Sequence, residues 1–562
     1  MNLRGLLWKK IKALREKYRV RYPKVRIEKP KHLIIIPKFK DIREVDARYP
    51  LIEMFAFAHI KWDDEKKKLI YEVIEPELSE KEKEQFEIIK RGLLEIIDVD
   101  FNIVKESGKA LEYLEDNVKK VLDDEGIVLK QDSYVKIMYY IFRDFIGFNE
   151  IEPLMHDPYI EDIGCDGLNI SLFVVHRLFG SLETNIVFRD MDYLNNFVIK
   201  LAERCGRYIS YAKPLLDGTL PDGSRVQATL ARDVTTRGPT FSIRKFKPNP
   251  LSPIDLINLK TASSELMAYL WLLIESRASM LICGGVSTGK TTFLNAISMF
   301  ISPEKKIISI EDTRELNLPH LNWIPAVSRV GYGIPGKGGK LYGEVTLYEL
   351  LKESFRQNPD YVIVGEVRGE EAYVMFQGMA SGHTSLGTIH AGSLEDVIKR
   401  LETPPINLSP SLVETLDVVI VMTHAKDISE SARRVKEVYE IESVDPNTGN
   451  AQSIRTFNWL HRTDSFESNI NESYLLKKLS YEKGLTYEQI LEEVNTRKSV
   501  LEWMSKHNIR NYDEVTKIFN FYSKEPETVK RWVRNDEEPY DKKKKGRIEG
   551  KWVSASGLRI IS

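Results

Sequence analysis

The order of apolar and polar residues divides the chain into segments of different predicted structure. Between residues 41 and 150, two strand-like runs flank a charged turn, and three stretches of helical periodicity follow. Residues 151–246 contain short apolar runs, turns and one helical stretch. We therefore predict a small helical and hairpin-bearing domain over 41–150 and a compact α+β domain over 151–246. The predicted strands are 56–62, 69–74, 172–176 and 240–245, and the predicted helices are 79–97, 109–123, 134–145 and 193–205.

A proline-rich segment separates these two domains from the rest of the chain. Pro248, Pro250 and Pro253 lie within seven residues. Proline fixes the backbone and lacks an N–H donor, so neither a helix nor a central strand is expected to continue through them. We predict a semi-rigid linker and a domain boundary over residues 247–260.

Apolar strands alternate with helices after this linker, which is the pattern of a wound, largely parallel sheet. Residues 261–460 are therefore predicted to form an α/β domain, residues 461–540 a helical region and residues 541–562 a tail. The predicted strands are 280–283, 307–310, 361–364 and 416–422, and the predicted helices are 264–276, 290–298, 347–356, 393–401, 486–495 and 499–507.

Composition excludes several classes of protein. The chain has 562 residues, of which 42% are hydrophobic and 29% charged, a balance typical of a globular protein with three or four domains. Its three cysteines are too few for a disulfide framework or a four-cysteine metal site, and they favour a reducing cytosol. No apolar run approaches the length of a membrane span, and basic residues interrupt the N-terminal apolar run, so secretion is not expected.

Charge is distributed unevenly along the chain. Residues 1–40 hold 14 Lys and Arg but only two acidic residues, and their apolar positions recur at three- and four-residue steps. A helix there would be an amphipathic basic arm. Three interpretations are open for this arm: contact with a membrane surface or a partner protein, a solvated packing helix, or nucleic-acid binding.

The strongest chemical signal is a glycine-rich motif between a predicted strand and a predicted helix. It fits the P-loop pattern G-x-x-x-x-G-K-[ST], in which backbone N–H groups and a helix N-terminus face phosphate oxygens. We expect Lys290 to hold the β- and γ-phosphates, Thr291 to ligate Mg²⁺ and Thr292 to reach the α-phosphate. The residues of the predicted nucleotide site are Gly284, Gly285, Val286, Ser287, Thr288, Gly289, Lys290, Thr291 and Thr292.

Two acidic residues follow predicted strands at the end of the sheet where wound α/β domains bind ligands. Glu311 follows the strand at 307–310, and Glu366 follows the strand at 361–364 after one glycine. An acid in such a place is more often a solvated turn or a helix cap, but the P-loop upstream favours a catalytic interpretation. We expect Glu366 to act on Mg²⁺ and water, and Glu311 to orient the attacking water.

His390 is a third candidate, and it follows an apolar run within a segment of small residues, 378–392. Small residues allow close approach of the backbone to another group, so His390 is predicted to touch the γ-phosphate or to sense its loss. A hydrogen-bonded core histidine is the alternative. A second glycine-rich segment, 331–343, is predicted to be a mobile loop rather than a phosphate site.

These motifs, in this order and spacing, resemble those of the type II/IV secretion ATPase family. The resemblance covers roughly residues 50 to 530, and residues 157–163 resemble the archaeal branch of that family. It is carried by the P-loop, by residues 310–312, 358–369 and 387–391, and by the upstream segments 220–225 and 242–245.

The resemblance implies a RecA-like P-loop NTPase core, a preceding α+β N-terminal domain and a helical C-terminal segment. It implies a Mg²⁺-dependent ATPase with ATP and Mg²⁺ as cofactors, which forms a homo-hexamer in the cytoplasm at the inner face of the cell membrane. Such a ring drives a polytopic membrane platform protein that assembles a type IV pilus-like filament. The basic arm would bring the ring toward the membrane surface.

In this family, arginines of the N-terminal domain complete the nucleotide site, which suits a guanidinium group meeting phosphate charge. Arg225 and Arg244 are the candidates for this catalytic role, and Arg232, Arg237 and Arg368 compete with them. An arginine supplied in this way can change the rate by about 10³- to 10⁵-fold.

Gly365 departs from ordinary P-loop enzymes, many of which have an Asp before the strand-end Glu. The family shares this substitution. Mg²⁺ is therefore expected to be held mainly by Thr291, the phosphates and water, with Glu366 as the other candidate metal residue.

The leading hypothesis is a motor ATPase that converts ATP hydrolysis into domain movement between subunits. Within this class, the cargo is a pilus or secretion filament, or alternatively an archaellum. A nucleic-acid-associated RecA-like motor is the alternative from a different class, motivated by the basic arm, although no nucleic-acid partner is expected under the leading hypothesis. The intact P-loop disfavours a non-catalytic scaffold.

Overall fold

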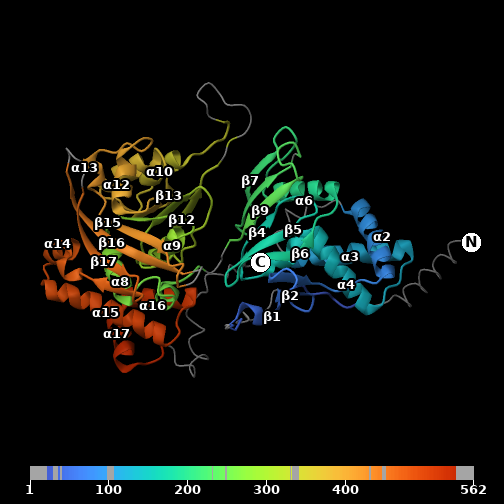
Figure 1. Ribbon diagram of the computed structural model, residues 1–562, viewed down its shortest axis with the longest axis horizontal. Coiled ribbons are helices and arrows are strands. Elements are labelled where there is room, and N and C mark those ends of the chain that lie inside the picture. The colour runs from blue at the N-terminus through green and yellow to red at the C-terminus, as the bar shows by residue number, and fades with distance from the viewer. Residues whose placement is uncertain are drawn as a thin grey trace, which may run out of the picture. The chain divides into compact units, whose positions relative to one another are not determined.

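The computed structural model describes residues 22–28, 36–37, 39, 41–97, 107–230, 232–246, 250–329, 331, 341–428, 432–445 and 451–539. Most of the predicted basic arm, residues 247–249 of the predicted linker, most of the glycine-rich segment 331–343 and the predicted tail lie outside these residues. The chain divides into two compact units, Met1–Phe246 and Lys247–Ser562 (Figure 1).

The first unit is built on one nine-stranded sheet, with strands in the order β1-β2-β3-β6-β5-β4-β9-β8-β7. The pair β3–β6 is parallel, and the other neighbouring strands are antiparallel. The strands are β1 (Asp46–Ile52), β2 (Ala56–Asp63), β3 (Lys68–Ile74), β4 (Ile160–Cys165), β5 (Ser171–His176), β6 (Gly180–Val187), β7 (Leu215–Thr219), β8 (Arg225–Thr229) and β9 (Thr240–Arg244). The helices are α2 (Glu80–Ile96), α3 (Ser107–Glu125), α4 (Gln131–Ile141), α5 (Glu152–His156) and α6 (Met191–Arg204), and a π-helical turn (Phe142–Ile146) follows α4.

Residues 41–150 and 151–246, for which the sequence predicts two domains, share this sheet. Strand β3 pairs with β6, with Tyr71 opposite Thr184. One apolar core includes the buried side chains of Tyr71 and Leu172. The predicted boundary near residue 150 is therefore not a boundary between units, because strand pairing across it depends on residues more than a hundred positions apart, which local periodicity does not report.

The second unit contains another nine-stranded sheet, in the order β12-β11-β13-β14-β10-β15-β16-β17-β18. In this spatial order, neighbouring strands from β12 through β10 to β15 are parallel, and neighbouring strands from β15 to β18 are antiparallel. The strands are β10 (Met280–Gly284), β11 (Ile307–Glu311), β12 (Trp323–Val327), β13 (Tyr361–Val367), β14 (Thr384–Ile389), β15 (Val418–His424), β16 (Arg433–Val444), β17 (Ala451–Leu460) and β18 (Ser465–Ser468). The helices are α7 (Pro253–Asn258), α8 (Ser264–Glu275), α9 (Lys290–Ser298), α10 (Leu347–Arg356), α11 (Glu371–Ala380), α12 (Leu394–Glu402), α13 (Pro410–Val413), α14 (Tyr474–Lys483), α15 (Tyr487–Lys506), α16 (Tyr512–Lys524) and α17 (Pro526–Asn535).

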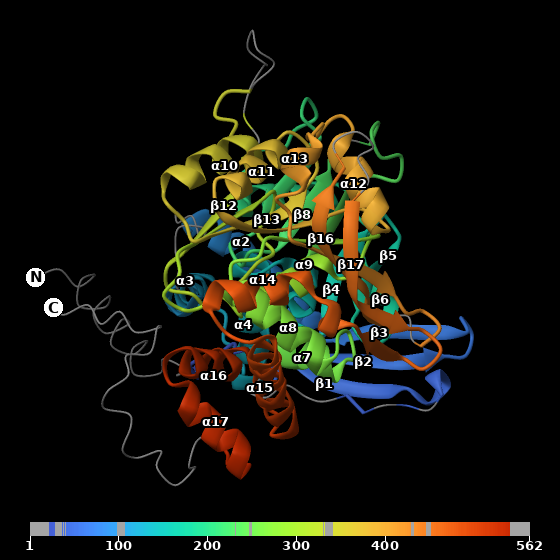
Figure 2. The same ribbon diagram turned by 90° about the vertical axis from the view of Figure 1, so that its left-hand side faces the viewer.

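The parallel strands of the second unit are apolar on both faces because helices cover both faces. In β10, Met280 and Ile282 belong to the core that contains α8 and α15, whereas Leu281 and Cys283 belong to the core that contains α11 and α12. Figures 1 and 2 show α8 and α15 on one side of the sheet and α10 and α12 on the other. This three-layer arrangement confirms the predicted α/β fold of the second unit.

Two predictions on helices are corrected by the structure. Six of the 14 residues of the predicted linker 247–260 are helical: α7 begins after Ser252, whose hydroxyl caps the backbone N–H of Asp255, and a proline fits the first turn of a helix. Helix α15 is continuous, where the sequence predicts two helices. The charged Arg497 interrupts the apolar pattern there, yet it is buried and bonded to Glu275 of α8 (2.6 Å).

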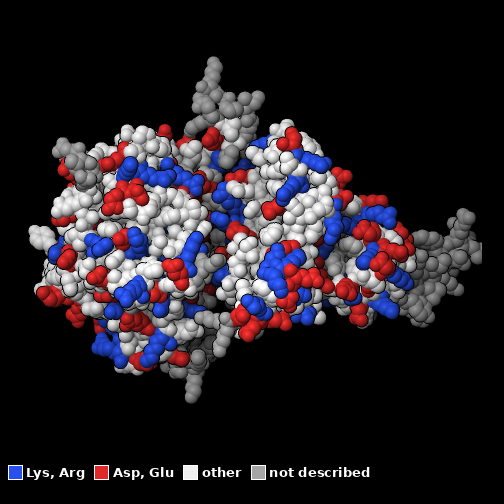
Figure 3. Space-filling model, viewed as in Figure 1, with Lys and Arg blue, Asp and Glu red and all other residues white. Residues whose placement is uncertain are grey.

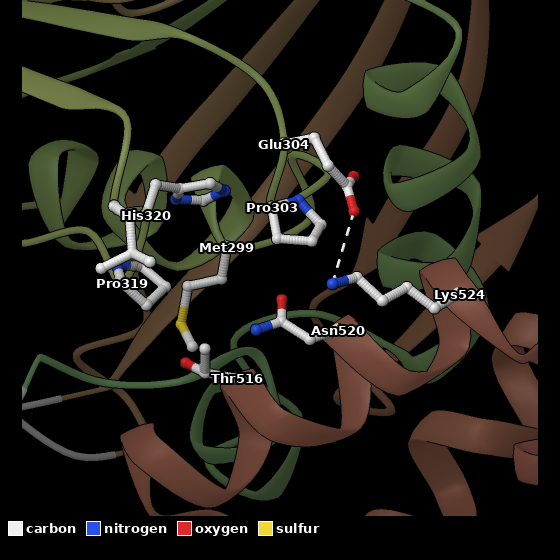
Figure 4. A pocket seen from close by; sticks show the side chains of 9 residues that line it. Met299, Pro303, Glu304, Pro319, His320, Thr516, Asn520 and Lys524 are labelled. Atoms are coloured by element: carbon white, nitrogen blue, oxygen red, sulfur yellow. Dashed lines mark ion pairs between the residues drawn. The ribbon is translucent and has the colours of Figure 1, made fainter. Parts of the chain in front are cut away.

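A pocket lies between α16 and the loops that follow α9 and β11 (Figure 4). His320 and Asn520 line it, and Lys524 pairs with Glu304 across it at 3.7 Å. None of its lining residues belongs to the predicted nucleotide site.

Acidic and basic side chains are interspersed on the faces shown in Figure 3. None of the helices in the described part of the chain combines the length and the apolar composition that a membrane span requires.

Candidate nucleotide-binding site

The P-loop connects β10 to α9, so it lies at the carboxyl end of a central parallel strand. Its backbone turns through two left-handed residues, Ser287 (φ +59°) and Gly289 (φ +89°), and Gly289 is the N-cap of α9. A glycine at position 289 is therefore required by the backbone. The hydroxyl of Thr288 donates to the carbonyl of Gly285 at 3.0 Å and ties the two sides of the loop together.

Lys290 is buried at the first position of α9 and folds back over the loop. Its ammonium donates to the carbonyls of Gly284 (3.2 Å) and Gly285 (2.8 Å). Burial lowers the pKa of Lys290, and the nearby carboxylate of Glu366 opposes this shift. Thr291 is half-buried and Thr292 is exposed in the same helical turn. The ammonium thus occupies the concave side of the loop, where phosphate oxygens would take over its contacts.

His390 joins Lys290 to Glu366. It follows β14, and its Nδ1 lies 3.3 Å from the Lys290 ammonium while its Nε2 lies 3.2 Å from Oε1 of Glu366. Because the ammonium can only donate, Nδ1 must accept and Nε2 must carry the proton. Burial and the charge of Lys290 lower the pKa of His390, which favours this neutral form. His390 is therefore hydrogen-bonded within the site, and its contact with the γ-phosphate stays a prediction.

Glu366 lies at a bulge of β13, where the pairing with β14 shifts between Val364 and Val367. Bulges change the direction of a side chain, and they are common next to active sites. The second oxygen of Glu366 accepts a short hydrogen bond from Arg368. Although burial raises the pKa of Glu366, this bond and the neighbouring cations lower it overall, so the carboxylate is ionised at neutral pH.

Glu311, the last residue of β11, is almost fully buried beside Gly365. Its Oε1 accepts from the backbone N–H groups of Glu315 (2.9 Å) and Leu316 (3.0 Å), and its buried Oε2 has no partner. A Cβ atom at position 365 would lie 2.9 Å from Cγ of Glu311, so a larger residue than glycine there would displace the Glu311 side chain. Burial raises the pKa of Glu311 to about 7, which suits proton exchange with a water molecule.

Replacing Glu311 with Gln is expected to remove a pH-dependent loss of stability. The pKa is about 7 in the folded protein and about 4.3 in an unfolded chain. Between these values only the unfolded chain releases the proton, so wild-type stability falls as pH rises through this window and stays lower above it. Relative to wild type, Glu311→Gln should gain roughly 2 to 3 kcal/mol of unfolding free energy between pH 5 and pH 8, measured by urea unfolding. The exposed neighbour is the control: an equal gain in Glu315→Gln would contradict this explanation.

Arg225 and Arg244 belong to the first unit, on the neighbouring strands β8 and β9, and lie directly opposite each other. Each is paired with an aspartate, Arg225 with Asp217 at 3.0 Å and Arg244 with Asp162 at 2.9 Å. Two guanidinium groups are therefore held side by side on one face of the sheet. Their part in a nucleotide site stays a prediction.

Three contacts of the site are not visible as sequence motifs. Arg400 of α12 donates to the carbonyl of His390 at 2.9 Å. His424 and Arg433, at the facing ends of β15 and β16, contact carbonyls of the P-loop. The only sequence signal that could have identified His424 is a histidine at the end of a strand. The sequence does not show which strand lies beside β10.

The residues present fit a nucleotide with a divalent cation. The loop offers backbone N–H groups beside a buried ammonium, and Thr291 and Glu366 offer oxygen ligands of the kind that Mg²⁺ prefers. Among the described residues, no three His, Cys, Asp or Glu side chains converge as a metal centre.

Comparisons with known proteins give the family of the chain. A profile of the type II/IV secretion system protein family matches residues 172–503, more than half of the chain. An uncharacterized protein of Methanocaldococcus jannaschii, MJ0900, is 36% identical over 515 residues, which are 87% of this chain and 91% of that protein. The type IV secretion system protein PtlH of Bordetella pertussis is 29% identical over 282 residues, covering 44% of this chain and 81% of PtlH.

Among solved structures, the VirB11 ATPase from the Brucella suis type IV secretion system in complex with sulphate is similar to 52% of this chain and 92% of its own, with 22% identity and a TM-score of 0.27. The family match spans the P-loop, both candidate acids, His390 and the two arginines. The chain therefore belongs to the type II/IV secretion system ATPase family.

Proposed function

We propose that the chain is a Mg²⁺-dependent ATP hydrolase that powers assembly or secretion of a type IV pilus-like filament through a polytopic membrane platform protein. It would act as a homo-hexamer in the cytoplasm, attached to the inner face of the cell membrane. The observation that carries the proposal is the chain of contacts Lys290–His390–Glu366 at the P-loop, which places a phosphate-binding cation 3.3 Å from a histidine that is 3.2 Å from a strand-end carboxylate.

We assign each residue of the core site a separate role in ATP hydrolysis. Lys290 and the P-loop N–H groups would bind the phosphates, and the Lys290 ammonium would exchange the carbonyls of its own loop for phosphate oxygens. Glu366 would accept a proton from the attacking water, and Glu311 would hold that water through its unpartnered oxygen. Mg²⁺, held by Thr291 and by Glu366, would neutralise charge that develops on the phosphates.

His390 would report the state of the nucleotide. It contacts Lys290 and Glu366 at the same time, so a phosphate group that draws Lys290 away also frees Nδ1 of His390. Its carbonyl accepts a hydrogen bond from Arg400 of α12. A change in His390 on loss of the γ-phosphate would therefore be transmitted to a helix of the core. This is the role of a phosphate sensor.

Arg225 and Arg244 would supply positive charge from the N-terminal domain to the nucleotide of a neighbouring subunit. Asp217 and Asp162 neutralise them in the free chain, so phosphate would compete with these carboxylates. An arginine that acts in this way makes the rate depend on ring assembly. The archaellum motor is the variant of this function that the same site also supports, since the residues of the core do not distinguish the two cargoes.

The proposal is tested by measuring Mg-ATPase activity across a concentration series while light scattering follows the mass. Activity per chain is expected to rise as the hexamer forms, because the arginines come from another subunit. Lys290→Ala should lose turnover but still assemble. Full activity as a monomer would refute the ring and the arginine roles, and absence of activity in the hexamer would refute the hydrolase itself.

A further inference from the structure

The end of the β15–β16 hairpin lies beside the P-loop. Strand β15 pairs in parallel with β10, with Met422 opposite Gly284, the first residue of the loop. Strand β15 then extends two residues further, to His424, which faces Arg433 of β16 across the antiparallel pair. The two side chains therefore come from adjacent positions at the edge where the phosphate-binding loop begins.

Each of the two side chains holds one carbonyl of the loop. Nε2 of His424 lies 3.1 Å from the carbonyl oxygen of Val286, and Nε of Arg433 donates to the carbonyl oxygen of Ser287 at 3.1 Å. Because a carbonyl only accepts, His424 carries its proton on Nε2. Val286 is 77% exposed, so packing of its side chain does not fix this part of the loop.

These two bonds fix the direction of the next two N–H groups. In a trans peptide the C=O and the following N–H lie in one plane and point in opposite directions. A carbonyl of Val286 turned toward His424 therefore turns the N–H of Ser287 away from it. The same holds for the carbonyl of Ser287, held by Arg433, and the N–H of Thr288.

We propose that His424 and Arg433 are positioning residues of the nucleotide site, which orient the Ser287 and Thr288 N–H groups toward the phosphates of ATP. The inference rests on the proposed function, since it concerns the same loop. Neither residue touches the reacting atoms. Their effect is to hold in advance an orientation that the loop otherwise has to adopt on binding, which strengthens binding without any added interaction with the ligand.

The arginine permits a sharp test because Gln and Met reproduce different parts of it. The amide nitrogen of Gln stands at the same number of bonds from Cα as Nε of Arg, so Arg433→Gln keeps an N–H donor and removes the guanidinium charge. Arg433→Met keeps the length and removes the donor. His424→Gln and His424→Leu form the corresponding pair. Lys436 lies on the same strand and pairs with Glu437 at 3.2 Å. Lys436→Met is therefore the control for loss of a positive charge from this strand.

Binding of MgATP and of MgADP to the full chain is measured by titration calorimetry, and turnover gives KM and kcat. Arg433→Met and His424→Leu are expected to raise the dissociation constants and KM about fivefold each, as loss of one hydrogen bond would, with kcat within about twofold of wild type. Both Gln variants should bind within about twofold of wild type, as should Lys436→Met. Unfolding midpoints of all variants are compared to confirm that they fold.

Wild-type affinity in both Arg433→Met and His424→Leu would overturn the inference and leave the proposed function intact. Weak binding by Arg433→Gln, equal to that of Arg433→Met, would show that the charge rather than the N–H donor matters and would overturn the positioning role of the arginine. Absence of MgATP binding in the wild-type chain would overturn the proposed function itself.

Discussion

Glu366→Gln is expected to lower the rate of ATP hydrolysis by about 10²- to 10⁴-fold, the contribution of a general base in the transition state. The amide of Gln has nearly the shape of the carboxylate but cannot accept the proton of the attacking water. The pKa of Glu366 is lowered by the hydrogen bond from Arg368 and by neighbouring cations, although burial opposes this, so the wild-type group is in the basic form at neutral pH.

Nucleotide binding should survive the same substitution. His390 connects Glu366 to Lys290, so the negative charge of Glu366 lies near the expected phosphate site. Removal of this charge lowers its repulsion of the ATP phosphates. The amide oxygen of Gln can still ligate Mg²⁺, so we expect MgATP to bind Glu366→Gln at least as tightly as wild type. Equilibrium binding measures this affinity, and single-turnover kinetics measure the loss of hydrolysis separately.

Glu370→Gln is the matched control for this prediction. Glu370 is exposed four residues further along, and its side chain does not cap the helix α11 that it precedes. Its replacement should leave both turnover and binding within twofold of wild type. A rate for Glu366→Gln within twofold of wild type would remove Glu366 from the catalytic step and leave Glu311 as the candidate base.

Glu440→Ala is expected to destabilise the second unit by about 3 to 5 kcal/mol, on the scale of several missing hydrogen bonds to one buried charge. Glu440 is fully buried in β16. It accepts from the hydroxyls of Tyr269 in α8 and Ser473, and from the backbone N–H groups of Tyr474 (2.7 Å) and Leu475 (3.0 Å) at the start of α14. Alanine would leave these donors without a partner in the interior.

Burial raises the pKa of Tyr269 far above its usual value, and the adjacent carboxylate adds to this, so its hydroxyl stays a donor at any accessible pH. Tyr269→Phe removes that one donor and should cost about 1 to 2 kcal/mol, less than half of the effect of Glu440→Ala. Glu442→Ala changes an exposed glutamate of the same strand and should stay within about 0.5 kcal/mol of wild type.

Hydrogen exchange measured by mass spectrometry resolves the peptides of the two units, so the first unit serves as an internal reference. Faster exchange in β16, α8 and α14 of Glu440→Ala, with unchanged exchange in the first unit, is the expected result. Equal protection in Glu440→Ala and Glu442→Ala would mean that this carboxylate does not join the three elements.

Several features follow from the sequence because they depend on neighbouring residues. The P-loop needs eight consecutive residues, and the apolar strand before it and the helix after it predict its place between β10 and α9. Glu311 and Glu366 were identifiable because the carboxyl ends of parallel strands meet at one edge of a sheet. Alternation of strands and helices after residue 261 predicted a wound sheet for the same local reason.

Only the tertiary structure decided how distant residues combine. His390 lies a hundred positions from Lys290, and Arg433 lies 146 positions from Ser287, so their contacts depend on the order of strands in the sheet. The single sheet of the first unit likewise depends on the β3–β6 pair. Arg497 and Glu440 interrupt the apolar pattern in sequence but are buried, because partners on other elements satisfy their charges. Periodicity reports which side of an element is apolar, whereas the partner that neutralises a buried charge is set by packing.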